Sequence, residues 1–250
     1  MKDRISQAAE LIKNANYFVV FTGAGISVES GIPPFRGENG LWTKFDPKLF
    51  DLDYFRKNPA KSWQLIRSLF YETFKTARPN RAHKALALLE KKEILKTIIT
   101  QNIDNLHQMA GSKKVLEYHG TYRFLKCLQC GFKTEVNEHF LQNPPPLCPM
   151  CNGILKPDFV FFGEMIPYQV AVQSELEAQK ADLMLIIGST GEVYPAAAIP
   201  ERAATYGSKI VEINIEPSNY TKHITDIFLQ GKATEVMGQL LQELQIDSTL

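Results

Sequence analysis

Short apolar runs that alternate with amphipathic stretches constrain the fold of this sequence more than any other feature. The runs YFVVFT and LMLIIG each lead into or end at glycine, as buried strands do before a tight turn. Strands that alternate with helices form a parallel sheet covered on both faces. The sequence therefore predicts an α/β fold, with strands at 17–22, 97–100, 115–120, 183–188 and 209–216 and helices at 3–14, 83–92, 168–180, 195–206 and 233–245.

Four cysteines stand in two CxxC pairs with 17 residues between the pairs. This spacing is typical of a zinc site with four thiolate ligands. Four thiolates complete a tetrahedron and leave no position open for substrate, so we expect a structural zinc ion. The alternative is a set of reduced cysteines buried as small apolar side chains. The expected ligands are Cys127, Cys130, Cys148 and Cys151.

Two segments interrupt the strand–helix alternation. Residues 37–75 are rich in aromatic and charged side chains and suit a helical insertion. Residues 121–157 hold both CxxC pairs, three consecutive prolines and few periodic stretches, which indicates a small zinc-binding module. These two segments are expected to form a second, smaller domain. The remainder, residues 1–36, 76–120 and 158–250, is expected to form a Rossmann-like domain.

Charge and composition exclude several classes of protein. Lys plus Arg number 28 and Asp plus Glu number 27, so the net charge of +1 gives no electrostatic basis for bulk nucleic-acid binding. No apolar run approaches the roughly 18 residues that a membrane helix needs. The N-terminal segment also lacks the apolar core of a signal peptide. We expect a cytoplasmic protein whose partners include neither membrane nor nucleic acid.

A glycine-rich turn, TGAGISVESGIPPFRG, follows the first predicted strand. Gly23 and Gly25 would let the backbone approach a phosphate at the start of a helix. The alternative is a tight turn without a ligand, because Val28 stands where the dinucleotide fingerprint has its third glycine. The loop that follows carries Phe35, an aromatic face, and Arg36, a planar cation suited to phosphate.

Polar residues end two further predicted strands. The motif TQNID (100–104) lies where open α/β sheets bind ligands, although Asp104 could simply cap a helix. His119 ends another strand of the same sheet and precedes Gly120. A general base that works near pH 7 suits a histidine, and His107, within a short helix, is a poorer candidate.

Together these motifs resemble the sirtuins, which are NAD-dependent protein lysine deacylases. The resemblance extends in order over essentially the whole chain. It is carried by GAGISVESGIPPFRG with GLW, by TQNID with LHQMAG, by HG, by the two CxxC pairs, by KPDFVFFGE, by GSTGEVYPAA and by INIEPS.

The resemblance implies a role for particular residues. His119 would act as base on the ribose, and Asn102 would contact the ribose or its water. NAD would be held by Gly23, Ala24, Gly25, Ser27, Phe35, Arg36, Gln101, Asn102, Ile103, Asp104, Ser189, Thr190, Asn214, Lys232 and Ala233. An acetylated-lysine protein or peptide would contact Val160, Phe162, Gly163, Glu164, Val193 and Tyr194.

The implied reaction consumes NAD. The amide oxygen of the acyl-lysine attacks the anomeric carbon as nicotinamide leaves, and the products are free lysine and an O-acyl-ADP-ribose. Because side chains alternate along a strand, Val160 in the acyl tunnel would leave Phe159 facing elsewhere. Ile66 and Leu69 stand where sirtuins that prefer succinyl or malonyl lysine have a Tyr-x-x-Arg pair, which favours acetyl or longer uncharged acyl groups.

Four other functions share some of these features. A longer-chain lysine deacylase or a protein mono-ADP-ribosyltransferase would use the same NAD residues, and only product analysis separates them. A zinc ribbon that binds nucleic acid is disfavoured by the near-zero net charge. A hydride-transfer dehydrogenase is disfavoured because the acidic residue that would hold the ribose is missing.

Overall fold

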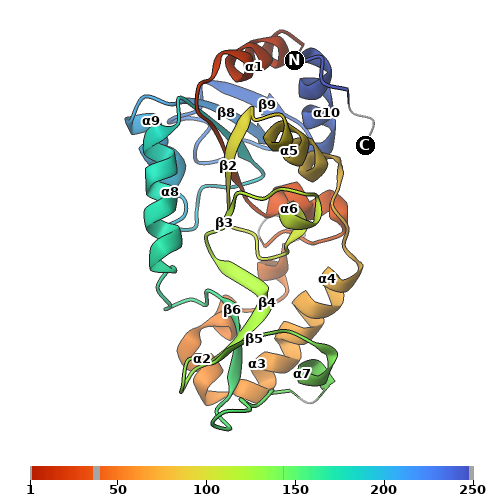
Figure 1. Cartoon of the computed structure of the whole chain (residues 1–250), viewed down its shortest axis with the longest axis vertical. Helices are drawn as coiled ribbons and strands as arrows, with labels where there is room; N and C mark the ends of the chain where they lie inside the picture. The colour runs from red at the N-terminus through yellow and green to blue at the C-terminus, as the bar shows by residue number, and fades with distance from the viewer. Residues whose placement is uncertain (1, 36–39, 143, 248–250) are drawn as a thin grey trace.

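A six-stranded parallel sheet forms the larger part of the molecule (Figure 1). The computed structural model describes residues 2–35, 40–142 and 144–247. The strand order is β3-β2-β1-β7-β8-β9, and neighbouring strands run in the same direction. The predicted parallel sheet is confirmed. Its strands are β1 (Phe18–Thr22), β2 (Leu95–Thr100), β3 (Val115–Glu117), β7 (Leu183–Ile187), β8 (Lys209–Asn214) and β9 (Ile227–Gln230).

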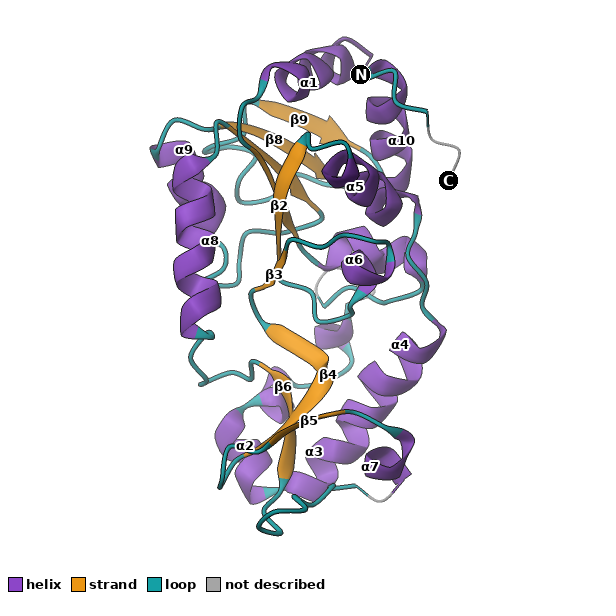
Figure 2. Ribbon diagram, in the orientation of Figure 1, coloured by secondary structure: helices purple, strands orange, loops and turns teal. Residues whose placement is uncertain are grey.

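Helices cover both faces of this sheet, as Figure 2 shows. One face packs on α1 (Lys2–Asn14), α5 (Arg81–Lys91) and α10 (Ala233–Glu243), and the other on α8 (Tyr168–Lys180) and α9 (Ala198–Thr205). Side chains alternate between the two faces along β1, so this strand contributes to both apolar clusters. Val20 joins the cluster on the first face, and Val19 and Phe21 join the cluster on the second. No helix in the described part of the chain combines the length and apolar character needed to span a bilayer.

The smaller part combines a three-stranded antiparallel sheet with short helices (Figure 2). Its strand order is β5-β4-β6, a sheet that the sequence pattern did not predict. The strands are short, and β5 exposes two of its three residues, so their apolar periodicity is weak. The elements are β4 (Gly120–Cys127), β5 (Lys133–Glu135), β6 (Leu155–Phe159), α2 (Leu52–Lys57), α3 (Pro59–Ile66), α4 (Glu72–Thr76), α6 (Leu106–Met109) near the junction, and α7 (Glu138–Gln142).

One apolar core joins the helical segment to the cysteine-bearing sheet. Trp63 of α3 is fully buried, and its indole N–H donates to the carbonyl of Leu155 in β6 at 2.8 Å. Phe70 contacts Phe159 edge-on, with ring centroids 5.3 Å apart. Because the two predicted insertions bury their apolar faces against each other, neither has a separate core.

Candidate active site

The carboxyl ends of four parallel strands bring most of the predicted NAD residues together. The side-chain amide of Gln101, after β2, donates to the hydroxyl of Ser189, after β7, at 2.8 Å. The side-chain amide of Asn214, at the end of β8, donates to the Ser189 carbonyl at 3.1 Å. The turn after β1 contacts the same region, because the Gly25 N–H donates to the Gly188 carbonyl at 2.9 Å. Ligands bind at this edge in open α/β sheets.

The glycines after β1 are required by close approach of two backbone segments. A Cβ on Gly25 would lie 2.5 Å from the Cα of Gly188, and a Cβ on Gly23 would lie 2.7 Å from the Gly188 carbonyl oxygen. Gly188 itself has a φ of 62°, which is unfavourable for other residues. The glycines therefore hold the turn against β7, and this packing also brings η1 (Ala24–Ser30) to the edge of the sheet.

Gly25→Ala is expected to destabilise the protein by about 2 kcal/mol or more, because backbone atoms must move to admit the methyl group. Gly31→Ala is the matched control: it lies at the other end of η1, has a φ of 86° and has no neighbouring atom within 4 Å of its added Cβ. Its cost should be limited to about 1–2 kcal/mol of backbone strain. Urea unfolding of both variants measures the difference, and a smaller loss of stability in Gly25→Ala than in Gly31→Ala would contradict this account.

A buried polar network lies beneath this turn. Ser27 is completely buried, and its hydroxyl donates to Asp104 at 2.7 Å. The Asn102 amide donates to the Gly23 carbonyl at 3.1 Å and to the Ser27 hydroxyl at 3.2 Å. The other Asp104 oxygen accepts the N–H of Leu106, the first residue of α6, at 2.9 Å, while the N-cap position of that helix is Asn105.

Burial raises the pKa of Asp104, while its hydrogen bonds from Ser27 and Leu106 act in the opposite direction. Both carboxylate oxygens already have donors, and 4% of the residue is exposed. Asp104 is therefore held in one orientation at the base of the site, which is the property required of a residue that orients a ligand.

Two further histidines complete the network on the side away from the pocket; the sequence carried no signal for His83, and it indicated His107 only as a poorer candidate for the base. His83 in α5 faces the Ser27 hydroxyl at 3.4 Å, and His107 in α6 faces the Thr22 hydroxyl at 3.0 Å. Burial lowers the pKa of His83 to about 3 and the pKa of His107 well below its usual value. Both rings are fully enclosed and neutral, so they support the site as hydrogen-bonding groups.

His119 lies between the two sheets, after β3 and before β4. Its Nδ1 lies 3.0 Å from the carbonyl oxygen of Gln101. Because a carbonyl only accepts, this hydrogen bond places the proton on Nδ1 and leaves the lone pair on Nε2. Burial lowers the pKa of His119, and the hydrogen bond to Gln101 acts in the opposite direction. His119 is thus a neutral imidazole with a fixed tautomer, as a general base requires.

A pocket opens between the turn after β1 and the helical segment of residues 41–76. Six of its lining residues come from the predicted NAD set: Ala24, Ser27, Phe35, Asn102, Ile103 and Asp104. The others are apolar: Ile32, Pro33 and Leu41 belong to the GAGISVESGIPPFRG and GLW motifs, whereas Leu69, Phe70 and Phe74 lie in the helical insertion. For Phe70 and Phe74, the high aromatic content of the insertion was the only signal. Among the lining residues that the structure describes, the Asp104 carboxyl is the one charged group.

From the end of β6 onward, more buried and more exposed side chains alternate, as the sequence predicts. Phe159 is buried and stacks on Phe161 at 5.1 Å, whereas Val160 is half-buried and Phe162 is 44% exposed. The Phe162 ring lies 6.3 Å from Trp42, and Trp42 lies 5.3 Å from Phe35. The predicted NAD residue Phe35 and the predicted substrate residue Phe162 therefore flank one indole.

Glu164, a predicted substrate residue, is held within the protein itself. Its Oε2 accepts the N–H of Phe161 at 2.7 Å and pairs with the ammonium of Lys156 at 2.9 Å. Lys156 is buried, also donates to the carbonyls of Pro157 and Phe159, and lies over the Phe161 ring. These contacts hold Oε2 of Glu164 and shape this loop.

The remaining predicted residues lie around the same edge. Gly163 has a φ of 85°, and Tyr194 is 61% exposed. Val193 and Thr190 lie in the loop after β7, and Asn219 holds this loop through the carbonyls of Thr190 and Gly191. Lys232 precedes α10 and Ala233 begins it. Arg36 lies outside the described residues.

A buried carboxylate that the sequence did not single out anchors the loop after β8. Glu212 is fully buried and accepts hydrogen bonds from the hydroxyls of Ser218, Thr221 and Thr225. This loop carries Asn219, which in turn holds the loop after β7.

The four cysteines converge on one point in the small sheet. Their sulfur atoms lie within 4.8 Å of one another, with Cys127 and Cys151 3.5 Å apart and Cys130 and Cys148 3.6 Å apart. A tetrahedral zinc ion with Zn–S bonds of about 2.3 Å needs sulfur atoms about 3.8 Å apart. The donor set and its size therefore fit a structural zinc ion that joins the loop after β4 to the loop before β6.

Comparison with known proteins supports one family. The Sir2 family model matches residues 23–195. The "NAD-dependent protein deacylase" of Thermococcus kodakarensis is 41% identical over 248 residues, covering 96% of each chain. The "NAD-dependent protein deacetylase" of Caldivirga maquilingensis is 42% identical, covering 96% of this chain and 93% of its own.

A solved structure agrees over nearly the full length. It is a Sir2 variant with a deacetylated p53 peptide and 3′-O-acetyl-ADP-ribose. Its TM-score is 0.91 at 34% identity, and the match covers 97% of this chain and 99% of that chain.

Proposed function

This chain belongs to the Sir2 family of NAD-dependent protein deacylases, and on that premise we propose that it transfers acetyl groups from lysine side chains to ADP-ribose. The observation that carries the proposal is the fixed Nδ1–H tautomer of His119, which is hydrogen-bonded to the carbonyl of Gln101, the first residue of the Gln101–Asp104 motif. The two curated relatives act with NAD, and the related structure holds a peptide beside 3′-O-acetyl-ADP-ribose.

The proposed reaction uses NAD as a substrate. The amide oxygen of acetyl-lysine forms a bond to the anomeric carbon while the bond to nicotinamide breaks. The ribose 2′-hydroxyl then attacks the former amide carbon, the lysine amine leaves, and water completes the formation of O-acetyl-ADP-ribose. Nε2 of His119 accepts the proton of the ribose hydroxyl.

The weak amide nucleophile makes positioning and exclusion of water the main tasks of the protein. Asp104 and Asn102 lie at the floor of the pocket in fixed orientations, and we assign them to the nicotinamide and ribose side. Phe35 lines the same pocket, where it can cover the sugar after nicotinamide departs. We assign Ser189, Asn214 and the start of α10 to the adenosine half of NAD.

The apolar wall of the pocket favours an uncharged acyl group on the substrate lysine. Leu69 and Phe70 of the helical segment line the pocket, and its described lining contains no cation. A succinyl or malonyl group would bring a carboxylate to this wall without a partner, at a considerable free-energy cost. Acetyl is the proposed group, and longer uncharged acyl groups are the alternative.

The peptide is proposed to lie between Gly163–Glu164 and Gly191–Tyr194, at the boundary between the Rossmann-like domain and the small domain. Main-chain pairing in this position gives affinity with little sequence choice. The domain division that we propose is 1–36, 76–120 and 158–250 for the NAD domain, with 37–75 and 121–157 as the small domain.

Nicotinamide release from NAD, measured with and without an acetyl-lysine peptide, tests the proposed function. We expect release that depends on the peptide and a peptide mass reduced by one acetyl group. Release accompanied by a gain of ADP-ribose on protein would support the mono-ADP-ribosyltransferase instead. If acetyl-lysine gives no release, a panel of longer acyl groups decides whether the chain is a longer-chain deacylase.

The rate of deacetylation should decline as the pH falls through the pKa of His119. Burial lowers this pKa, so the neutral base dominates at neutral pH and the midpoint of the decline should lie below the usual histidine value of 6.5. The value of kcat/KM for the peptide, measured from about pH 5 to pH 8, tests this. Nicotinamide exchange, which precedes proton removal from the ribose, is the internal control. A decline whose midpoint lies above the usual histidine pKa would contradict the assignment.

A further inference from the structure

The chain passes from the large sheet to the small sheet through His119. β3 ends at Glu117 and β4 begins at Gly120, so only Tyr118 and His119 lie between them. The His119 ring is held by the large-sheet side, through the Gln101 carbonyl. Its own carbonyl accepts the N–H of Val160 at 2.8 Å, immediately after β6 of the small sheet. The relative position of the two sheets therefore sets the position of the imidazole.

Contacts on the small-sheet side are tight. Gly120 has a φ of 73°, and a Cβ at this position would overlap the Asp158 carbonyl in β6. The backbone beside His119 therefore cannot shift without moving β6, which leads into Val160 and Phe162.

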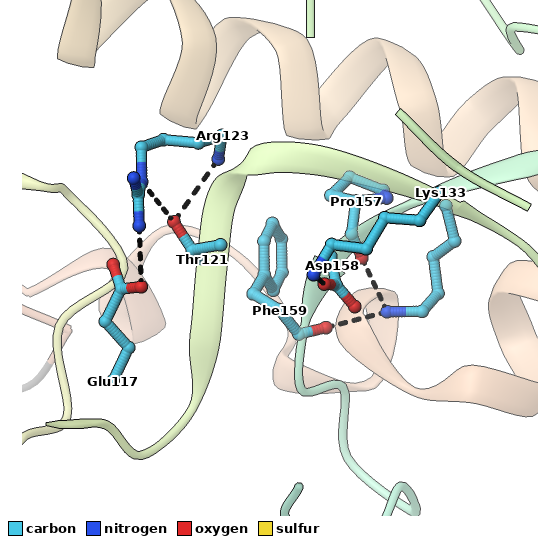
Figure 3. Close-up of polar contacts among 8 residues, drawn as sticks. Glu117, Thr121, Arg123, Lys133, Pro157, Asp158 and Phe159 are labelled. Atoms are coloured by element: carbon cyan, nitrogen blue, oxygen red, sulfur yellow. Dashed lines mark hydrogen bonds and ion pairs between the residues drawn. The ribbon is translucent and has the colours of Figure 1, made fainter. Parts of the chain in front are cut away.

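An ion pair connects the large sheet to the small sheet beside this passage of the chain, as Figure 3 shows. Arg123 of β4 contacts Oε2 of Glu117, the last residue of β3, through Nη2 at 2.9 Å. The Arg123 Nε also donates to the Thr121 hydroxyl at 3.1 Å, which fixes the plane of the guanidinium. The side chains of Glu117 and Arg123 are 16% and 37% exposed, so solvent screens this pair less than a surface pair.

The carboxylate of Glu117 also acts on the pocket. Its negative charge contributes to the raised pKa of Asp104, although burial is the larger cause. Glu117 thus acts on Asp104 and precedes His119 by two residues, and it is not itself among the residues that line the pocket.

We propose that Glu117 and Arg123 are positioning residues that fix the angle between the two sheets, and through it the approach of His119 Nε2 to the ribose hydroxyl. The proposal rests on the proposed function. The proposal makes a specific kinetic prediction. Loss of the Glu117–Arg123 ion pair slows removal of the ribose proton, which follows nicotinamide departure, and leaves the rate of nicotinamide departure unchanged.

Glu117→Gln tests the claim by removing the charge while keeping the shape. Deacetylation by the purified full chain should fall at least about tenfold, because a shift of about 1 Å at a reacting group costs up to about 100-fold. The exchange of labelled nicotinamide into NAD, measured with the same acetyl-lysine peptide, should change by less than about twofold. Arg123→Gln should likewise reduce the deacetylation rate and leave nicotinamide exchange nearly unchanged. Arg123→Lys, which keeps the charge, should restore part of the deacetylation rate.

Lys133→Gln is the matched control. Lys133 of β5 pairs with Asp158 of β6 at 2.6 Å, so it is an ion pair of the same small sheet that does not reach β3 (Figure 3). It should leave both rates unchanged. Equal losses of exchange and deacetylation in Glu117→Gln and Arg123→Gln, or no loss in either variant, would overturn the proposal. Failure of the proposed function is distinguishable, since the unmodified chain would then show no deacetylation.

Discussion

Replacing His119 with alanine should reduce deacetylation by about 10²–10⁴-fold, the range that a general base contributes. Its Nδ1 is held 3.0 Å from the Gln101 carbonyl, which leaves Nε2 as the basic nitrogen. Without this nitrogen the ribose hydroxyl keeps its proton and attacks the former amide carbon poorly. Nicotinamide departure precedes this step, so nicotinamide exchange should persist in the variant while release of free lysine is lost.

His139→Ala is the control for this substitution. His139 is an exposed residue of α7 whose described neighbour is the ring of Phe140. Its replacement should leave both activities unchanged. Retention of a normal deacetylation rate in His119→Ala would show that another group acts as base. The buried His83 and His107 are poor replacements, because burial lowers the pKa of each and their rings face the interior.

Loss of the zinc ion should unfold the small sheet and abolish activity with it. Structural zinc sites contribute apparent binding free energies of about 10–16 kcal/mol. Cys148 is fully buried and faces Cys130 at 3.6 Å, so Cys148→Ser removes a ligand from the interior of the cluster. We expect no bound zinc and a much lower midpoint of thermal unfolding.

Loss of the zinc ion should also disturb the active site, because β4 and β6 connect the cysteine cluster to it. β4 follows His119 directly, and β6 leads into Val160 and Phe162. Met150→Ala is the control, since Met150 lies between two ligands yet is 72% exposed. It should keep one zinc ion per chain and full activity. A Cys148→Ser variant that stays folded and active without metal would contradict a structural role for zinc.

Most strands and helices of the large sheet were predictable because they have continuous apolar runs or a helical apolar period. β1 and β7 are buried at every position, and the apolar residues of α1 recur at helical spacing. The four cysteines were equally readable, since their spacing is set by the geometry of one ion. The short strands β4, β5, β6 and β9 were not predicted, because their stability comes from tertiary pairing and not from local pattern.

Side-chain partners were the least accessible part of the site. The motif suggests Glu164 as a ligand-binding residue, but the sequence does not show that Lys156 holds its carboxylate. Gly25 suggests an approach to phosphate, whereas its nearest neighbour is the backbone of Gly188, 163 residues further along the chain. Glu117, Glu212 and His83 belong to no recognised motif position, and their roles arise from contacts between distant segments.

The path of one oxygen atom tests the central claim most directly, namely that acetyl-lysine attacks NAD through its amide oxygen. The substrate is an acetyl-lysine peptide that carries ¹⁸O in the amide carbonyl, and mass spectrometry follows the label. Attack on the anomeric carbon places the label in O-acetyl-ADP-ribose. Recovery of the label in free acetate, with NAD unconsumed, would mean direct hydrolysis of the amide and would contradict the account.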